Sequence, residues 1–444
     1  MRLISIKKKK LVSIILTVVV GLTLILATGI AGLSQEKVTL VFRQNDPPAS
    51  AVGLSDAVAE FDRNHPNIKV KYEVVPWSDA LNQFIREAGV GAGPDVLQSA
   101  FVWTMDLAKA GTLVKLNPLM EQYPLPYGIE DFVAVDLGML DEGIYGIPWT
   151  TDTFAITYRK DFFAEAGIVG FPDDSWSHFK QVAKKLTRDR DRDGVIDQYG
   201  FAFPAGSGST GGMWFLVNYF IWSHGYTFMK QAADGTWGLG VDAKAIAEAM
   251  RYFNSFFEEN ISPRSLIAID NWSDPELIYG LAKGDFAMGF MPPQSFRAVM
   301  DANPEAPVSS AQVPAGRVTR RTHLGGRTLA INKNTKHLKE AWELLKWMCS
   351  EHVFETYYRQ QFSAQKTLLE KITYGPEYEG YVKLIPQAQT FHTYIISPVR
   401  VQTMWALTNR EFAAVYSGQK SIETASEDLI REIKEALEEA ISES

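Results

Sequence analysis

The chain has 444 residues, of which 46% are hydrophobic and 22% charged, a composition typical of a soluble globular protein that excludes wholesale disorder. At roughly 150 residues per domain, this length predicts two or three domains. The formal net charge of −8 argues against non-specific nucleic-acid binding. The single cysteine excludes intramolecular disulfides and cysteine-based metal centres.

The N-terminal segment has a different character from the rest of the chain. Basic residues at Arg2 and 7–10 precede an apolar run over 11–30, which predicts a secretory signal with cleavage after Ala31. The run is also long enough, about 20 residues, to cross a bilayer, so an uncleaved anchor is the alternative. No cysteine follows the run, and lipid anchoring is therefore not expected. Without residues 1–31, the 39 basic and 52 acidic residues that remain give a net charge of −13.

The next part of the chain alternates between strand and helix patterns. Apolar or alternating runs over 38–42, 68–75 and 95–97 predict strands. Helical spacing through Phe61 and Phe84 predicts a helix between each pair of strands. Strand–helix repeats of this length form parallel sheets with helices on their faces, so the fold class is α/β. Helices with a clear 3.6-residue period are also predicted over 243–259, 337–350 and 422–441.

Several short motifs follow one another in a fixed order over nearly all of this part of the chain. They include Gly93-Pro94-Asp95-Val96, Tyr145-Gly146-Ile147-Pro148-Trp149, Gly284-Asp285-Phe286-Ala287-Met288 and Ala341-Trp342-Glu343-Leu344-Leu345-Lys346. Together they resemble the extracellular solute-binding proteins of ATP-driven (ABC) importers, the family that includes maltose- and trehalose-binding proteins. The resemblance implies a two-lobe periplasmic-binding-protein fold, with the ligand held in a cleft between two α/β lobes that close about a hinge.

The resemblance also implies the boundaries of the lobes. The first lobe is expected to take 34–149 and 325–389, and the second 152–322 and 391–444. The crossings between the lobes are then expected near 149–153, 322–326 and 390–393. Several crossings constrain the lobes to one hinge motion, so ligand binding selects the closed state.

Ligand-binding residues are expected first where the strands of the first lobe end. Asn45 and Asp46 follow the first strand, and Gln98 and Ser99 follow the third, at the sheet edge where ligands usually bind in α/β proteins. Simple turn capping is the alternative for these four residues.

Further candidates come from the hinge and from the second half of the chain. Aromatic rings stack on the apolar faces of sugars, whereas amides, carboxylates and guanidinium groups bind their hydroxyls. On this chemistry and by resemblance, the additional candidates are Trp149, Asp152, Met291, Gln294, Gly326, Arg327, Arg400 and Trp405. Packing at the hinge is the alternative for Trp149 and Asp152, and helix packing is the alternative for Trp405. Trp77, Trp103, Trp214, Trp222 and Trp272 are possible contacts without a rank.

An acidic loop raises the possibility of a bound cation. Asp189, Asp191, Asp193 and Asp197 alternate with other residues around Gly194, which resembles half of a calcium-binding loop. The glutamate usual at the twelfth position is absent, and arginines lie between the acids. A structural Ca²⁺ is one interpretation and a salt-bridged surface loop the other. No other cofactor is expected.

No motif of a known catalytic class is present in the sequence. The seven histidines lack the spacing of metal ligands, most are expected at the surface, and Cys349 is expected to be a buried, inert thiol on a helix face. The chain is therefore expected not to be an enzyme. We expect a monomeric receptor, in the periplasm or on the outer face of the membrane, that captures a sugar and delivers it to a membrane permease. The alternatives are a binding protein of the same fold for a peptide or polyol phosphate, and a carbohydrate-active enzyme.

Overall fold

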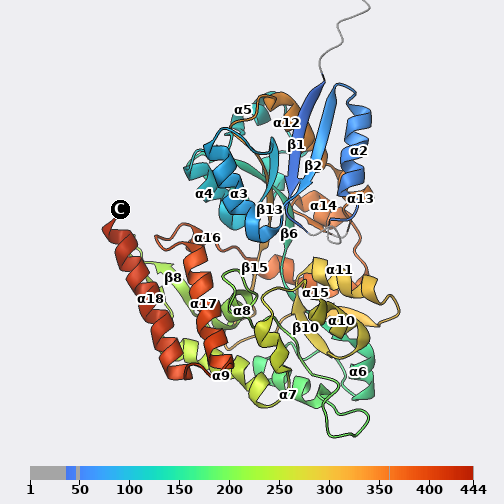
Figure 1. Cartoon of the computed structure of the whole chain (residues 1–444), viewed down its shortest axis with the longest axis vertical. Helices are drawn as coiled ribbons and strands as arrows, with labels where there is room; N and C mark the ends of the chain where they lie inside the picture. The colour runs from blue at the N-terminus through green and yellow to red at the C-terminus, as the bar shows by residue number, and fades with distance from the viewer. Residues whose placement is uncertain (1–36, 47–50, 360, 444) are drawn as a thin grey trace, which may run out of the picture.

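The computed structural model describes residues 37–46, 51–359 and 361–443. Within these residues the chain forms two lobes stacked along the long axis of the molecule (Figure 1). The predicted signal or anchor over 1–31 lies outside the described residues. In the part of the chain that the structure covers, no helix has both the length and the apolar character needed to cross a membrane.

The first lobe is built on a mixed sheet, which within the described residues has six strands in the order β14-β6-β13-β3-β1-β2. Strand β1 pairs in parallel with β2 and β3, whereas β13 runs antiparallel to β3 and β6. The three predicted strands of this region are confirmed as β1, β2 and β3. The strands are β1 (Val38–Gln44), β2 (Ile68–Val74), β3 (Val96–Ala100), β6 (Gly146–Asp152), β13 (Gly325–Ile331) and β14 (Phe362–Ser363).

Amphipathic helices cover both faces of this sheet. Helix α2 (Leu54–Asn64) buries one stripe that includes Leu54, Val58 and Phe61, as its 3.6-residue spacing requires. It ends at His65, whose ring stacks on Phe61 with centroids 4.0 Å apart and whose successor is a proline. The other helices are α3 (Trp77–Gly89), α4 (Phe101–Lys109), α5 (Asn117–Gln122), α12 (Leu338–Met348), α13 (Glu351–Thr356) and α14 (Lys366–Lys371).

The second lobe has a smaller antiparallel sheet within a largely helical shell. Its order is β10-β7-β11, with β7 (Ala155–Arg159) between β10 (Met288–Met291) and β11 (Val308–Ala311). Helix α8 (Met213–Ser223) is buried along its whole length and forms the centre of the lobe. Around it lie α6 (Lys160–Glu165), α7 (Trp176–Leu186), α9 (Ala243–Glu258), α10 (Pro275–Lys283), α11 (Pro293–Ala302), α15 (Glu379–Leu384), α16 (His392–Ile395), α17 (Val401–Tyr416), α18 (Ile422–Ser442) and the hairpin β8 (Thr227–Gln231) with β9 (Trp237–Gly240).

Two crossings between the lobes lie close to their expected positions. The first passes from the end of β6 to the start of β7 through residues 153–154. The second runs from β11 through β12 (Thr322–His323) into β13, and β12 pairs in parallel with β15 (Ala388–Gln389).

The chain returns to the second lobe earlier than the expected boundary at residue 389. Ile372 still belongs to the core of the first lobe, whereas Tyr378 and Tyr381 pack on Phe296 of α11 in the second lobe. The Ser310 hydroxyl of β11 donates to the Glu377 carbonyl at 2.6 Å, and α15 packs against β11 and β7. The expected extension of the first lobe through 389 is therefore wrong, because the intervening helices are too short to show a period in the sequence.

Candidate functional site

Asp46 forms a charged corner where β1 ends. Its Oδ1 accepts hydrogen bonds from Arg327 Nη2 at 2.9 Å and Trp77 Nε1 at 3.0 Å, and its Oδ2 accepts one from Gln98 Nε2 at 3.1 Å. The residue is 1% exposed. A carboxylate this deeply buried is tolerated because it is paired and hydrogen-bonded. The corner is therefore fixed in place by groups from three other segments of the first lobe.

The other candidates at this sheet edge are held by one another. The Asn45 backbone N–H donates to Gln98 Oε1 at 3.1 Å, and Asn45 Nδ2 donates to the Gln98 carbonyl at 3.0 Å. The Ser99 hydroxyl, also buried, accepts from Thr104 Oγ1 at 3.2 Å. The structure thus brings Asn45, Asp46, Gln98 and Ser99 together. The hydrogen bonds between Asn45 and Gln98 join residues 53 apart in the chain, so they link β1 to β3 and are not the turn capping named as the alternative.

Arg327 joins this corner to the end of β6. Its Nη1 donates to Asp152 Oδ2 at 2.8 Å while its Nη2 holds Asp46, and its guanidinium lies 5.6 Å from the Trp77 ring centroid. Burial alone would lower the pKa of Arg327, but the charges of Asp46 and Asp152 outweigh it and the pKa is raised. Arg327 therefore stays charged between two buried carboxylates.

Gly326 allows the backbone of β13 to place Arg327. Its φ of +150° is disfavoured for residues with a side chain, and an added Cβ would lie 2.2 Å from the Thr150 carbonyl oxygen of β6. The register between β13 and β6 also shifts directly after Arg327. Such irregularities re-aim a side chain. Here the guanidinium is directed at the carboxylates of Asp152, the last residue of β6, and Asp46, two residues after β1.

His323 continues the polar chain across the hinge. Its Nε2 lies 3.5 Å from Asp152 Oδ1, and its Nδ1 lies 2.6 Å from the Tyr219 hydroxyl on α8 of the second lobe. The same hydroxyl accepts from the Phe154 backbone N–H at 3.1 Å. Burial lowers the pKa of His323 against the opposing effect of Asp152, so the imidazole is neutral at pH 7.

Asp152 stays ionised in this chain. Burial alone would raise the pKa of Asp152, but the hydrogen bond with His323 and the charge of Arg327 outweigh it, and the pKa is lowered. The two crossings are thus linked by buried polar groups that extend from β1 to α8.

An aromatic group of the second lobe adjoins this hinge. Phe154 and Phe215 contact the His323 ring with centroids 4.8 and 4.6 Å away. Trp272 lies against both phenylalanines, at 4.6 and 5.3 Å, and Trp405 meets Phe215 edge-on at 5.2 Å. Both tryptophans are partly exposed. The two tryptophans are thus joined to His323 through Phe154 and Phe215, and their partly exposed rings are free to stack on an apolar surface of a ligand.

Trp405 is positioned by two contacts of its own. Its indole N–H donates to the Gly211 carbonyl at 2.8 Å, and its ring stacks on Trp214 with centroids 6.1 Å apart. The ring orientation is therefore fixed before any ligand arrives.

Trp149 has a structural position. It is 1% exposed, its indole N–H donates to the Met348 carbonyl at 2.8 Å, and its ring stacks on Tyr358 at 5.0 Å. The alternative for Trp149 was packing at the hinge. The residue does pack against its neighbours, but it does so in the core of the first lobe. The expectation of ligand contact is wrong for this residue because both its ring and its N–H are used inside the lobe.

The remaining candidates do not join the polar chain. Met291 is buried, and its carbonyl accepts from the Tyr381 hydroxyl at 3.0 Å. Gln294 lies in the first turn of α11, where its Oε1 is buried without a partner. Arg400 is exposed at the residue before α17.

The sequence did not rank several residues that the structure places in this region. Trp77, Trp103 and Trp272 were possible contacts without a rank, and His323 was grouped with histidines expected mostly at the surface. His323 is 3% exposed, and that expectation does not hold for it. The sequence pattern around His323 does not indicate burial, because strand β12 has only two residues and is too short to show an alternation of apolar and polar positions.

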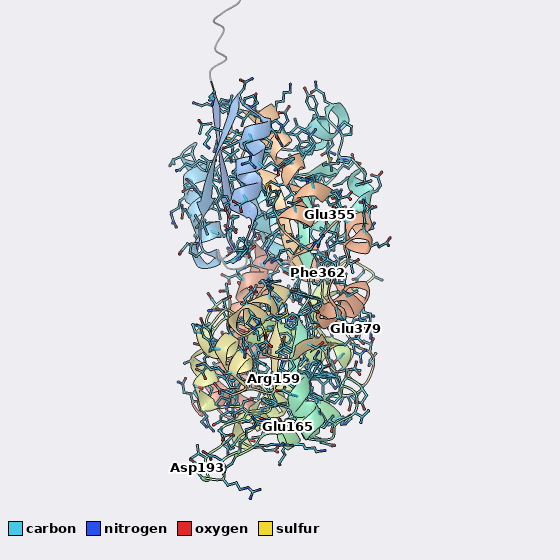
Figure 2. All side chains as sticks on the ribbon, turned by 90° about the vertical axis from the view of Figure 1, so that its right-hand side faces the viewer. Arg159, Glu165, Asp193, Glu355, Phe362 and Glu379 are labelled. Atoms are coloured by element: carbon cyan, nitrogen blue, oxygen red, sulfur yellow. The ribbon has the colours of Figure 1, made fainter. Side chains whose placement is uncertain are left out.

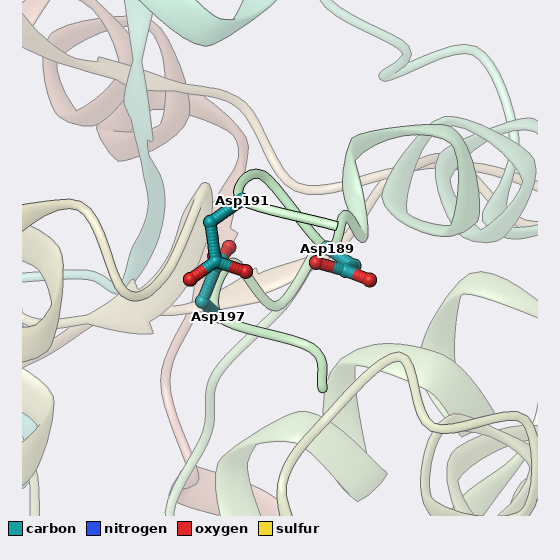
Figure 3. Close-up of side chains that lie close together, drawn as sticks. All are labelled: Asp189, Asp191 and Asp197. Carbon is teal, nitrogen blue, oxygen red and sulfur yellow. The ribbon is translucent and has the colours of Figure 1, made fainter. Parts of the chain in front are cut away.

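The acidic loop brings three of its four aspartates together. Carboxylate oxygens of Asp189, Asp191 and Asp197 lie within 4.8 Å of one another (Figure 3). Asp193 is not part of this group, and its Oδ1 accepts from the Val195 backbone N–H instead. The loop lies at the far end of the second lobe (Figure 2). Calcium binding by this loop stays a prediction.

Comparison with known proteins gives a consistent result. A family model described as bacterial extracellular solute-binding protein matches residues 45–352. A putative binding protein of Brucella abortus is 24% identical over 310 residues, which is 70% of each chain. The galactooligosaccharide-binding protein of Bacillus subtilis is 21% identical, over 69% of this chain and 68% of its own length.

A similar solved structure covers nearly the whole described chain. It is an ABC transporter solute-binding protein from Thermotoga lettingae bound with α-D-tagatose, with a TM-score of 0.77 and 18% identity. The match covers 90% of this chain and 100% of that one. This likeness confirms the predicted α/β fold with two lobes.

Proposed function

The chain belongs to the bacterial extracellular solute-binding protein family, and on that premise we propose that it captures a carbohydrate between its lobes and delivers it to an ABC permease. Members of this family are exported binding proteins. The sugar class is supported by names of relatives, such as the galactooligosaccharide-binding protein, and by the chemistry of the hinge region.

One observation carries the proposal: two partly exposed tryptophans pack on the phenylalanines that contact His323 at the crossings. Trp272 and Trp405 offer faces for the C–H surface of a sugar ring, while the buried Asp46, Asp152 and Arg327 pair with one another and fix the crossings. The carboxylates and the guanidinium are held by each other. The crossings are therefore ordered before a ligand arrives, which lowers the entropic cost of binding.

The proposed mechanism uses the crossings as a hinge. A saccharide that contacts both lobes favours the closed arrangement, because it gains contacts there that the open arrangement lacks. We propose that the monomer in this closed form docks on the permease. Export by the segment over 1–31, without a lipid anchor, belongs to the same proposal.

A ligand panel tests the sugar class. Maltotriose, mannobiose, galacto-oligosaccharides and tagatose are compared with peptides and polyol phosphates by thermal unfolding. Binding stabilises the folded state by about 2.7 kcal/mol at a ligand concentration 100 times Kd, so the true class raises Tm visibly. A rise with peptides but with no saccharide would reject the proposal. Conversion of a bound saccharide into products would instead indicate an enzyme.

Variants of one tryptophan connect the panel to the site. Trp405→Ala should weaken saccharide binding about tenfold, since loss of a stacked ring costs on the order of 1 kcal/mol beyond its area. Trp405→Phe should retain most of the affinity. Tyr279→Ala is the matched control, because Tyr279 is an aromatic residue of α10 that is 52% exposed.

A further inference from the structure

A buried asparagine lies one helical turn after Trp405 on α17. Residues four apart lie on the same face of a helix, so Asn409 shares the face of α17 that carries Trp405. Asn409 is 0% exposed, and both polar atoms of its amide are hydrogen-bonded inside the protein. A side chain at this depth does not touch a ligand itself. Any effect of Asn409 on binding must therefore act through its neighbours.

The hydrogen bonds of Asn409 reach both groups that hold Trp405. Its Nδ2 donates to the Gly211 carbonyl at 3.1 Å, and the same carbonyl accepts the indole N–H of Trp405 at 2.8 Å. Its Oδ1 accepts the backbone N–H of Trp214 at 2.9 Å, and the ring of Trp214 is the one on which Trp405 stacks. One amide thus connects the hydrogen-bond partner of Trp405 to its stacking partner.

The loop that carries the Gly211 carbonyl is rich in glycine. It covers residues 206–212 and leads directly into α8. Asn409 Nδ2 also donates to the Gly208 carbonyl at 2.8 Å, and the Gly211 backbone N–H donates to that carbonyl at 2.9 Å. An added Cβ at Gly211 would lie only 3.1 Å from Asn409 Nδ2. The glycines therefore allow the loop backbone to approach the asparagine closely.

Asp270 holds the loop from another side. Its Oδ1 accepts the Gly208 backbone N–H at 2.6 Å, and its carbonyl accepts the Gly212 backbone N–H at 2.8 Å. Trp272 follows two residues later in the chain, and an added Cβ at Gly212 would lie 3.0 Å from its ring. The loop is therefore adjacent to both partly exposed tryptophans of the second lobe.

We propose that Asn409 is a positioning residue for saccharide binding. It fixes the loop over 206–212 and the first turn of α8, and through them the plane that Trp405 presents to a sugar ring. A ring that is held in one orientation loses less freedom when a ligand stacks on it. This proposal rests on the proposed function, and it names a residue that affects the site without touching the ligand.

A double-mutant cycle tests the proposal by calorimetric titration of the whole protein. Maltotriose, mannobiose, galacto-oligosaccharides and tagatose are the probes, and the one that binds most tightly is used for the cycle. Asn409→Ala should weaken its binding about fivefold, the change that corresponds to one hydrogen bond. In the Trp405→Ala background the same substitution should change the affinity by less than about twofold, because the ring through which Asn409 acts is no longer there.

Two further variants separate positioning from a general loss of stability. Asn332→Ala is the matched control, because Asn332 is a buried asparagine of the first lobe whose amide also bonds backbone groups, the Ala92 carbonyl and the Asn334 N–H. It should lower Tm, as Asn409→Ala does, but leave the affinity within about twofold. Asp270→Ala is at an exposed position and frees the same loop, so it replaces Asn409→Ala in the cycle if that variant does not fold.

The outcomes separate this proposal from the proposed function. If saccharides bind and either Trp405→Ala or Asn409→Ala leaves the affinity unchanged, the positioning role is overturned and the sugar receptor stands. The same holds if Asn409→Ala weakens binding equally with and without Trp405, or if Asn332→Ala weakens it as much. If no saccharide binds at all, both proposals are overturned. A loss confined to the protein that carries Trp405, with the affinity of Asn332→Ala retained, supports the positioning role.

Discussion

Replacing Arg327 by methionine should destabilise the protein strongly at neutral pH. The guanidinium is buried between Asp46 and Asp152, with side-chain exposures of 5%, 1% and 9% for the three residues. Methionine keeps much of the volume but leaves two carboxylates buried without their cation. Breaking a buried ion pair from one side costs about 3–5 kcal/mol. We expect the free energy of unfolding to fall by that amount.

Urea unfolding monitored by tryptophan fluorescence measures the change. Arg297→Met is the matched control, because Arg297 pairs with Asp301 at the surface, where both side chains are about half exposed. The loss of such a pair costs about 0–1 kcal/mol. Adding Asp46→Asn and Asp152→Asn to Arg327→Met should recover part of the stability, because the neutral amides no longer bury charge.

The pH dependence gives a second, independent test of Arg327→Met. The folded pKa of Asp152 is lowered, so its stabilising contribution is present above its unfolded pKa and is lost as pH falls through the folded pKa. Without Arg327 the buried carboxylates are stabilised by protonation instead. The difference in the free energy of unfolding between wild type and variant should therefore be largest near pH 7 and should become smaller as the pH falls. A loss below about 1 kcal/mol, or a gap that does not change with pH, would refute this reasoning.

Three further predictions follow from local geometry. Gly326→Ala should lower Tm by several degrees and weaken saccharide binding together, because its Cβ would clash with the Thr150 carbonyl and displace Arg327; an unchanged Tm would contradict this. Cys349 is buried and its thiol pKa is raised by burial, so a thiol reagent at pH 8 should react only after unfolding, and rapid labelling of the native protein would show otherwise. If the acidic loop binds calcium, a chelator should lower Tm, and Asp197→Asn should remove the effect of the chelator on Tm. An equal Tm with and without chelator would reject the calcium site and favour the salt-bridged loop.

Elements with a long, regular pattern could be predicted from the sequence. The helices expected over 243–259, 337–350 and 422–441 are α9, α12 and α18, each within two residues at either end. Their apolar stripes repeat over three or more turns, and such a stripe has to face a core wherever the helix lies in the fold. The burial of Cys349 follows from the same stripe.

The site was predictable only in part. Asp46 follows β1 as expected, but Gln98 and Ser99 lie within β3 and not after it, because the strand continues to Ala100. The polar chain from Arg327 through Asp152 to His323 was not predictable as a unit. Asp152 lies 175 residues before Arg327 in the chain, and the pairing of the two residues accompanies an irregular register between β13 and β6.

The sequence alone determined the α/β class, the family resemblance, the acidic exported body and the long helices, because composition and periodicity are local properties of the chain. The tertiary structure decided which tryptophans are core and which are partly exposed. Trp149 packs inside the first lobe, whereas Trp405 is partly exposed and contacts Phe215 beside the hinge. It also decided where the chain crosses between the lobes, because short segments such as α15 gain their stability from packing on distant strands rather than from their own pattern.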